Sequence, residues 1–90
     1  ADLDDAALRD LRVRLDRLDA RSRRGPWTRT VLHLIAERPH VRAPDLAASL
    51  GRDTPSFKDD VRKLKALGLT ISHSPGYELS PRGRAALDRL

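Results

Sequence analysis

The chain has 90 residues, of which 39% are hydrophobic and 34% are charged. A domain commonly has roughly 100–200 residues, so we expect one domain with a small apolar core and not a disordered chain. The absence of cysteine excludes disulfides and thiolate metal sites and fits a cytoplasmic location. No apolar run approaches a membrane span, and no signal-peptide pattern is present. Because methionine is absent even at position 1, we expect a processed chain or a piece of a longer protein.

The formal net charge is +5 and the sequence pI is about 10.7. Such a balance favours polyanionic partners, nucleic acid first and a membrane surface second. The chain is rich in Arg, Ala, Leu and Asp, which is also what high-GC coding produces. Charge alone therefore does not decide the partner.

The first predicted element is an amphipathic helix over residues 3–21, which Asp2 can cap. On its exposed face, Asp19 and Arg23 are expected to form an acid-first i,i+4 pair. Its leucines step by three, four and three positions and form one apolar stripe: Leu8, Leu11, Leu15 and Leu18. The stripe fits the a and d positions of a coiled coil but covers only about two heptads. A homodimer through residues 3–21 and packing onto the same chain both stay open, and the break at Gly25-Pro26 slightly favours the dimer.

A second helix is predicted from Pro26, which suits a first helical turn, to the residue before Pro39. Its apolar positions follow at helical spacing: Trp27, Val31, Leu34 and Ile35. A short extended stub over residues 41–42 comes next. Pro44 then opens a third, short helix, and Gly51 suits its left-handed C-terminal cap.

A fourth helix is predicted over residues 55–67, capped by Asp53 or Thr54 and ended by Gly68. Its apolar positions share one helical face: Phe57, Val61 and Leu64. We expect this face in the core.

After the fourth helix the period changes from helical to two. One side of the first strand is predicted to carry Leu69, Ile71 and His73. Pro75-Gly76 offers the centre of a type II turn, so a tight hairpin follows. Ser80-Pro81 caps a last helix. The predicted fold class is therefore mainly α with a small β-hairpin.

Two helices joined by a Gly-containing turn form a helix-turn-helix, and a hairpin directly after them adds a wing. The chain resembles the winged helix-turn-helix superfamily, closest to bacterial regulators of the MarR and PadR types, in the segments Asp45–Gly51, Val61–Leu69 and Tyr77–Gly83. The resemblance covers residues 26–90. It implies a winged helix-turn-helix domain over 25–90, preceded by the amphipathic helix of 1–24. It also implies double-stranded DNA binding in transcription regulation, with helix 55–67 in the major groove.

On this resemblance, the candidate DNA-binding residues lie on helix 55–67, in the turn before it and at the start of the last helix. They are Arg52, Thr54, Ser56, Lys58, Asp59, Arg62, Lys63, Arg82 and Arg84. Simpler roles stay open for some of them. Ser56 also suits a helix cap, and Asp59 pairs more readily with Arg62 or Lys63 than with a cytosine. Lys65, near the helix end, is expected to be solvated.

The predicted hairpin tip departs from the basic wings that contact DNA. Residues 72–77 contain no Lys or Arg. Two rival interpretations therefore stay open: a winged helix that binds protein as an adaptor module of a larger protein, and one that binds RNA.

We expect no enzyme active site, no cofactor and no metal in this segment. His33, His40 and His73 fall in different predicted elements, and no carboxylate lies at metal-ligand spacing from any of them. The sequence also has no P-loop, nucleotide fingerprint or nucleophile motif.

Overall fold

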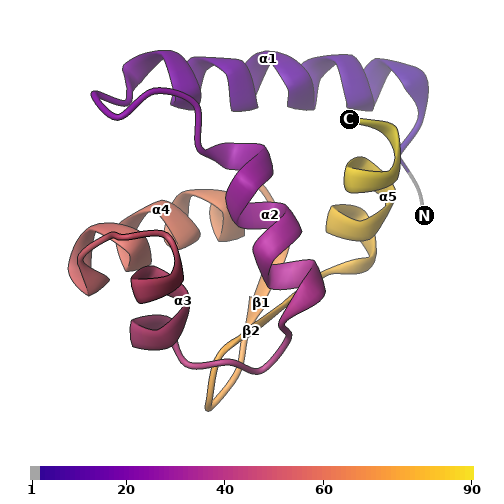
Figure 1. Cartoon of the computed structure of the whole chain (residues 1–90). Helices are drawn as coiled ribbons and strands as arrows, with labels where there is room; N and C mark the ends of the chain where they lie inside the picture. Colours follow the sequence, from indigo (N-terminus) through magenta and orange to yellow (C-terminus); the bar gives the residue numbers. More distant parts are fainter. Residues whose placement is uncertain (1–2) are drawn as a thin grey trace.

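A computed structural model describes residues 3–90. This part of the chain is mainly helical with one two-stranded antiparallel sheet, as the sequence predicts. In chain order the elements are α1 Asp5–Arg21, α2 Thr28–Glu37, α3 Ala43–Ser49, α4 Thr54–Ala66, β1 Thr70–Ser72, β2 Tyr77–Leu79 and α5 Pro81–Arg89. Figure 1 shows α1 lying across one end of the molecule, with the hairpin tip at the other end. Every helix within 3–90 is too short or too polar to span a bilayer.

Helix α1 begins at Asp5 because Asp4 caps it. The Asp4 carboxylate accepts a hydrogen bond of 2.7 Å from the backbone N–H of Ala7. The helix therefore starts later than predicted, and the predicted cap Asp2 lies outside the described residues.

The leucine stripe of α1 is buried within this single chain. Leu8, Leu11 and Leu15 belong to one apolar core together with residues of the later helices and the hairpin, and Leu18 packs against that core. The structure of the single chain thus shows the stripe packed onto its own core, one of the two alternatives that the sequence leaves open. The homodimer through residues 3–21 stays a prediction.

Asp19, near the end of α1, holds the start of α2. Its Oδ1 accepts hydrogen bonds from the backbone N–H groups of Trp27 (2.8 Å) and Thr28 (2.9 Å), and its Oδ2 accepts one from the Thr28 hydroxyl (2.8 Å). A carboxylate at a helix N-terminus satisfies amides that have no partner within the helix. Asp19 thus joins two helices across the turn at Gly25, in place of the predicted pair with Arg23.

Helices α3 and α4 pack against each other across a short turn. Gly51 ends α3 with a φ of 66°, in the left-handed region that glycine enters without steric cost. Asp53 caps α4 by accepting a hydrogen bond of 2.9 Å from the Ser56 N–H. The predicted apolar face of α4 is confirmed, and a carboxylate joins it: Phe57, Asp60, Val61 and Leu64 are buried.

Strand β1 pairs with β2 so that Thr70 lies opposite Leu79. The predicted alternation is wrong by one residue, because Thr70 is buried and Ile71 is exposed. Leu69 is buried but precedes the strand: its N–H donates to the Leu64 carbonyl (3.1 Å) in the turn that ends α4. The pleat therefore begins at Thr70, and Ile71 faces solvent.

Two glycines lie where no side chain fits. A Cβ on Gly76, in the hairpin turn, would lie 2.5 Å from the backbone carbon of His40. One on Gly83, in α5, would lie 2.1 Å from the carbonyl oxygen of Leu69. The hairpin turn thus lies directly against the loop before α3. The predicted extended stub at 41–42, in that loop, joins no strand.

Helix α5 closes the core against α2 and ties back to α1. Ser80 caps it by accepting a hydrogen bond of 2.9 Å from the Gly83 N–H. At its other end, Arg89 pairs with Asp5 and donates to the Leu3 carbonyl (2.9 Å). Helix α1 and the later elements therefore share one core.

Candidate nucleic-acid interface

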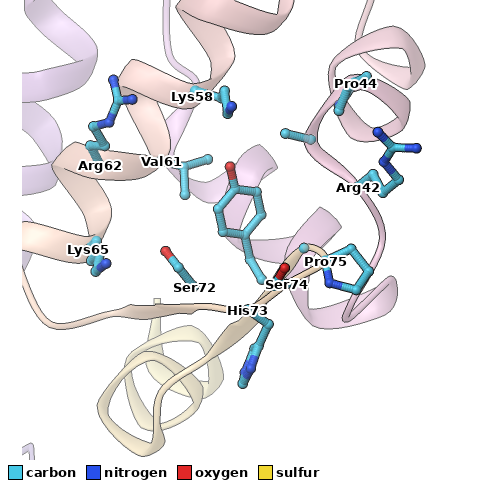
Figure 2. Close-up of a pocket in the computed structure, with 13 residues that line it drawn as sticks. Arg42, Pro44, Lys58, Val61, Arg62, Lys65, Ser72, His73, Ser74 and Pro75 are labelled. Carbon is cyan, nitrogen blue, oxygen red and sulfur yellow. The ribbon is translucent and has the colours of Figure 1, made fainter.

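A groove of about 520 Å³ lies between the N-terminal end of α3, the helix α4 and the hairpin. Figure 2 shows the side chains that line it. None of the lining residues is acidic, and four are basic: Arg42, Lys58, Arg62 and Lys65. A concave surface lined by one sign of charge concentrates the field, so this groove favours an anionic ligand.

Helix α4 presents three of the four cations from one face. Lys58, Arg62 and Lys65 are four and three residues apart, a spacing that stacks side chains on the same side of a helix. All three are exposed, while Val61 beside them is buried. Arg42 immediately precedes α3 and reaches the groove from the side opposite α4 (Figure 2). The cations thus flank the groove from α4 on one side and from the residue before α3 on the other.

The hairpin forms the remaining wall and contributes hydroxyl groups instead of cations. Ser72, Ser74 and Pro75 line the groove from this side (Figure 2). Since residues 72–77 contain no Lys or Arg, the positive charge of the groove comes from α4 and from Arg42, the residue before α3. Serine hydroxyls are suited to donate hydrogen bonds to phosphate oxygens.

Tyr77 connects the groove to the core. Its ring meets that of Phe57 edge to face, with centroids 6.5 Å apart. Burial raises the pKa of the Tyr77 hydroxyl above 10.0, and the nearby Arg62 guanidinium partly offsets this shift in pKa. The hydroxyl is therefore a neutral hydrogen-bonding group at physiological pH.

Arg62 forms the local ion pair with Asp59 that the sequence predicts. Its Nη1 lies 2.6 Å from Asp59 Oδ1, and the two side chains are 70% and 65% exposed. An ion pair in water contributes little because solvent already screens both charges. Arg62 can therefore exchange this carboxylate for another anion at small cost.

Ser56 and Lys63, two of the predicted DNA contacts, do not line the groove. Ser56 Oγ accepts hydrogen bonds from Arg24 (2.8 Å) and Arg52 (2.9 Å). Lys63 Nζ lies 3.3 Å from Asp60 Oδ1. Both side chains therefore have partners within the chain, on a different face of α4 from the three groove cations. Half-buried Thr54 opens α4 and is also outside the groove.

The remaining predicted phosphate contacts are three arginines. Arg52 pairs with Asp60 and its side chain is only 9% exposed, which favours a structural role over the predicted phosphate contact. Arg82 and Arg84 are exposed on α5 but do not line the groove. Arg82 Nε donates to the Leu67 carbonyl (3.2 Å), where α4 ends.

Sequence reasoning missed two of the groove cations. Lys65 follows Lys58 at i+7, and this spacing is the signal that places it on the same helical face. Arg42 carries no such signal, because its position depends on how the loop before α3 approaches the hairpin.

The chain matches no family model, and no curated protein or solved structure matches it either. What the chain binds must therefore be inferred from the groove and its surroundings.

The fold also assembles a group that the sequence spacing does not predict. His40, His73 and Glu78 each offer one metal-ligating atom, and these three atoms all lie within 4.8 Å of one another. Two of the three histidines, in different elements, thus meet a carboxylate beside the hairpin. Imidazole and carboxylate are ordinary ligands of divalent transition metals.

Proposed function

We propose that the chain is a winged helix-turn-helix module that binds double-stranded DNA, acting in transcription regulation in a bacterial cytoplasm. The observation that carries the proposal is the groove along α4: four basic side chains and no acidic residue line it. The order of elements supports it, because a packed helix pair, α3 and α4, is followed at once by an antiparallel hairpin.

In this proposal α4 enters the major groove, which is wide enough to admit one α-helix. Its exposed face carries Lys58, Arg62 and Lys65. Arg62 is suited to bidentate hydrogen bonds with a guanine, while the lysines neutralise phosphates as point charges. Arg42 and the serines of the hairpin contact the backbone on either side, so the hairpin positions the helix without contributing charge.

The proposal is tested by the salt dependence of binding to a mixed-sequence duplex, measured by fluorescence anisotropy. Each lost phosphate contact reduces the slope of log K against log salt by about 0.9. We expect the double variant Lys58→Gln/Lys65→Gln to bind more weakly and to reduce the slope by up to about 2. The matched control is Arg9→Gln/Arg17→Gln, which removes the same total charge from exposed positions of α1.

If both double variants reduced the slope equally, net charge and not the groove would explain binding, and the proposal would be wrong. Binding to a duplex RNA of the same sequence distinguishes the RNA interpretation from the DNA proposal, because the narrow major groove of A-form RNA does not admit a helix. Tighter binding to the RNA would favour that interpretation. If neither nucleic acid bound at low salt, the protein-adaptor interpretation would stand.

A further inference from the structure

The histidine–glutamate group lies where three backbone segments meet. His40 belongs to the loop between α2 and α3, His73 to the hairpin turn, and Glu78 to β2. His73 Nε2 lies 2.7 Å from Glu78 Oε1, and the two imidazole rings have centroids 4.6 Å apart. The ring contact brings the second histidine to an existing histidine–carboxylate pair.

Backbone hydrogen bonds hold these three residues in place, independently of their side chains. The His40 N–H donates to the Tyr77 carbonyl (2.9 Å), and the His73 N–H donates to the Gly76 carbonyl (2.8 Å). Glu78 lies within the strand pairing, opposite Ile71. The side chains are therefore presented together before any ligand arrives.

We propose that His40, His73 and Glu78 bind one divalent transition-metal ion of the zinc class. Zinc takes imidazole nitrogens and carboxylate oxygens at about 2.0–2.2 Å, which puts the ligand atoms of a tetrahedral site about 3.3 Å apart. The three atoms here lie within 4.8 Å of one another, and His40 and His73 are exposed. Small side-chain rotations therefore suffice to close the site, and water completes the fourth position.

A bound ion would link the loop before α3 to the turn and the second strand of the hairpin. The hairpin is otherwise a two-stranded ribbon, which is marginally stable by itself in water. The ion thus acts as a clip that stabilises the hairpin against the body of the domain. This inference concerns the metal alone and does not depend on what the basic groove binds.

The experiment is a zinc titration of the chain without a histidine tag, in competition with a chromophoric chelator. A cobalt titration, followed by the visible absorption of the bound ion, reports the coordination geometry. The variants are His40→Asn, His73→Gln and Glu78→Gln. Asparagine is chosen at His40 because φ there is 63°, a left-handed conformation that asparagine tolerates. The matched control is His33→Gln, which removes the exposed histidine of α2 outside the group.

We expect one equivalent of zinc in the unaltered chain and in His33→Gln, with the same affinity. Loss of even an outer-shell partner costs about 10–100-fold in metal affinity, so each variant of the group should bind at least about tenfold more weakly. Zinc should also raise the thermal unfolding midpoint of the unaltered chain and of His33→Gln. It should not raise the midpoint of His40→Asn or His73→Gln. Circular dichroism of each metal-free variant checks its folding.

Two results would overturn the inference. One is the absence of zinc binding by the unaltered chain at micromolar concentrations. The other is equal binding by all folded variants, which would assign the metal to an adventitious surface position.

Discussion

Arg52 and Asp60 form an ion pair that is nearly closed to solvent. Arg52 Nη2 lies 2.6 Å from Asp60 Oδ2, and the side chains are 9% and 11% exposed. The same nitrogen donates to Ser56 Oγ (2.9 Å), and the guanidinium lies 5.9 Å from the centre of the Phe57 ring. This arginine therefore fastens the turn between α3 and α4 to the buried side of α4, and its predicted contact with DNA stays a prediction.

Removal of either partner of this pair should be strongly destabilising. We expect Arg52→Met or Asp60→Asn to lower the free energy of unfolding by about 3–5 kcal/mol, because each leaves a buried charge or polar group without its partner. The double variant Arg52→Met/Asp60→Leu should recover much of the loss, since the site then becomes apolar. Urea unfolding measures all three.

Arg62→Gln is the matched control, because its exposed pair with Asp59 has the same 2.6 Å contact distance. An exposed pair contributes about 0–1 kcal/mol, so this variant should change stability little. Equal losses in Arg52→Met and Arg62→Gln would show that burial is not what makes the first pair matter.

The contrast between these two arginines explains what the sequence predicts and what it does not. Periodicity places helices and the hairpin correctly, because it depends only on local spacing. It does not indicate which polar residue of α4 or of the turn before it contacts a neighbouring element, so the sequence predicts Arg52, Ser56 and Lys63 at the same surface as Lys58. That choice depends on how α4 packs against α3 and β1, which is a property of tertiary structure.

The meeting of His40 with His73 is a second example. The two residues are far apart in sequence and lie in irregular segments, where no periodicity applies. Their approach follows from a backbone contact, the fit of Gly76 against His40, which no side-chain pattern encodes. The spacing of residues along the sequence does not predict long-range contacts of this kind.

Gly83 should be intolerant of any side chain. The Cβ of alanine at this position would lie 2.1 Å from the Leu69 carbonyl oxygen, so α5 or the α4–β1 connection must move. Overpacking typically costs about 1–3 kcal/mol, and we expect Gly83→Ala to lower the unfolding free energy by at least that, despite the better helix propensity of alanine. Arg84→Ala, at the next and exposed position, should be close to neutral. A Gly83→Ala chain as stable as Arg84→Ala would contradict the contact.

The Tyr77 hydroxyl should have a raised pKa, and this pKa should respond to the charge of Arg62. It is the one tyrosine in the sequence, so tyrosinate absorbance follows a single group. We expect a pKa above 10.0 because burial disfavours the phenolate, and a further rise in that pKa in Arg62→Gln because the guanidinium stabilises it. Ultraviolet difference titration measures both pKa values. A pKa of Tyr77 that does not rise in Arg62→Gln would show that the Arg62 guanidinium does not influence this hydroxyl.

The raised pKa of Tyr77 also determines whether the unfolding free energy rises or falls with pH. The folded pKa of Tyr77 is raised, so the unfolded chain loses this proton first as the pH rises. The unfolding free energy should therefore be unaffected by Tyr77 below pH 10.0 and fall as the pH rises from there through the folded pKa. Tyr77→Phe should show a shallower alkaline decline than the unaltered chain. An identical decline in both proteins would assign the effect to other groups.

Leu15 should stabilise the single chain and not an association between chains. Its side chain has no exposed surface in the isolated molecule, so we expect Leu15→Ala to lower the unfolding free energy by about 2–5 kcal/mol. Because the contact lies within one chain, the unfolding midpoint should be the same at low and high protein concentration. Val13→Ala, on the outer face of α1 where Val13 is 48% exposed, should change stability by no more than about 0.5 kcal/mol. A midpoint that rises with concentration in the unaltered chain, and no longer does so in Leu15→Ala, would instead show that the stripe joins two copies.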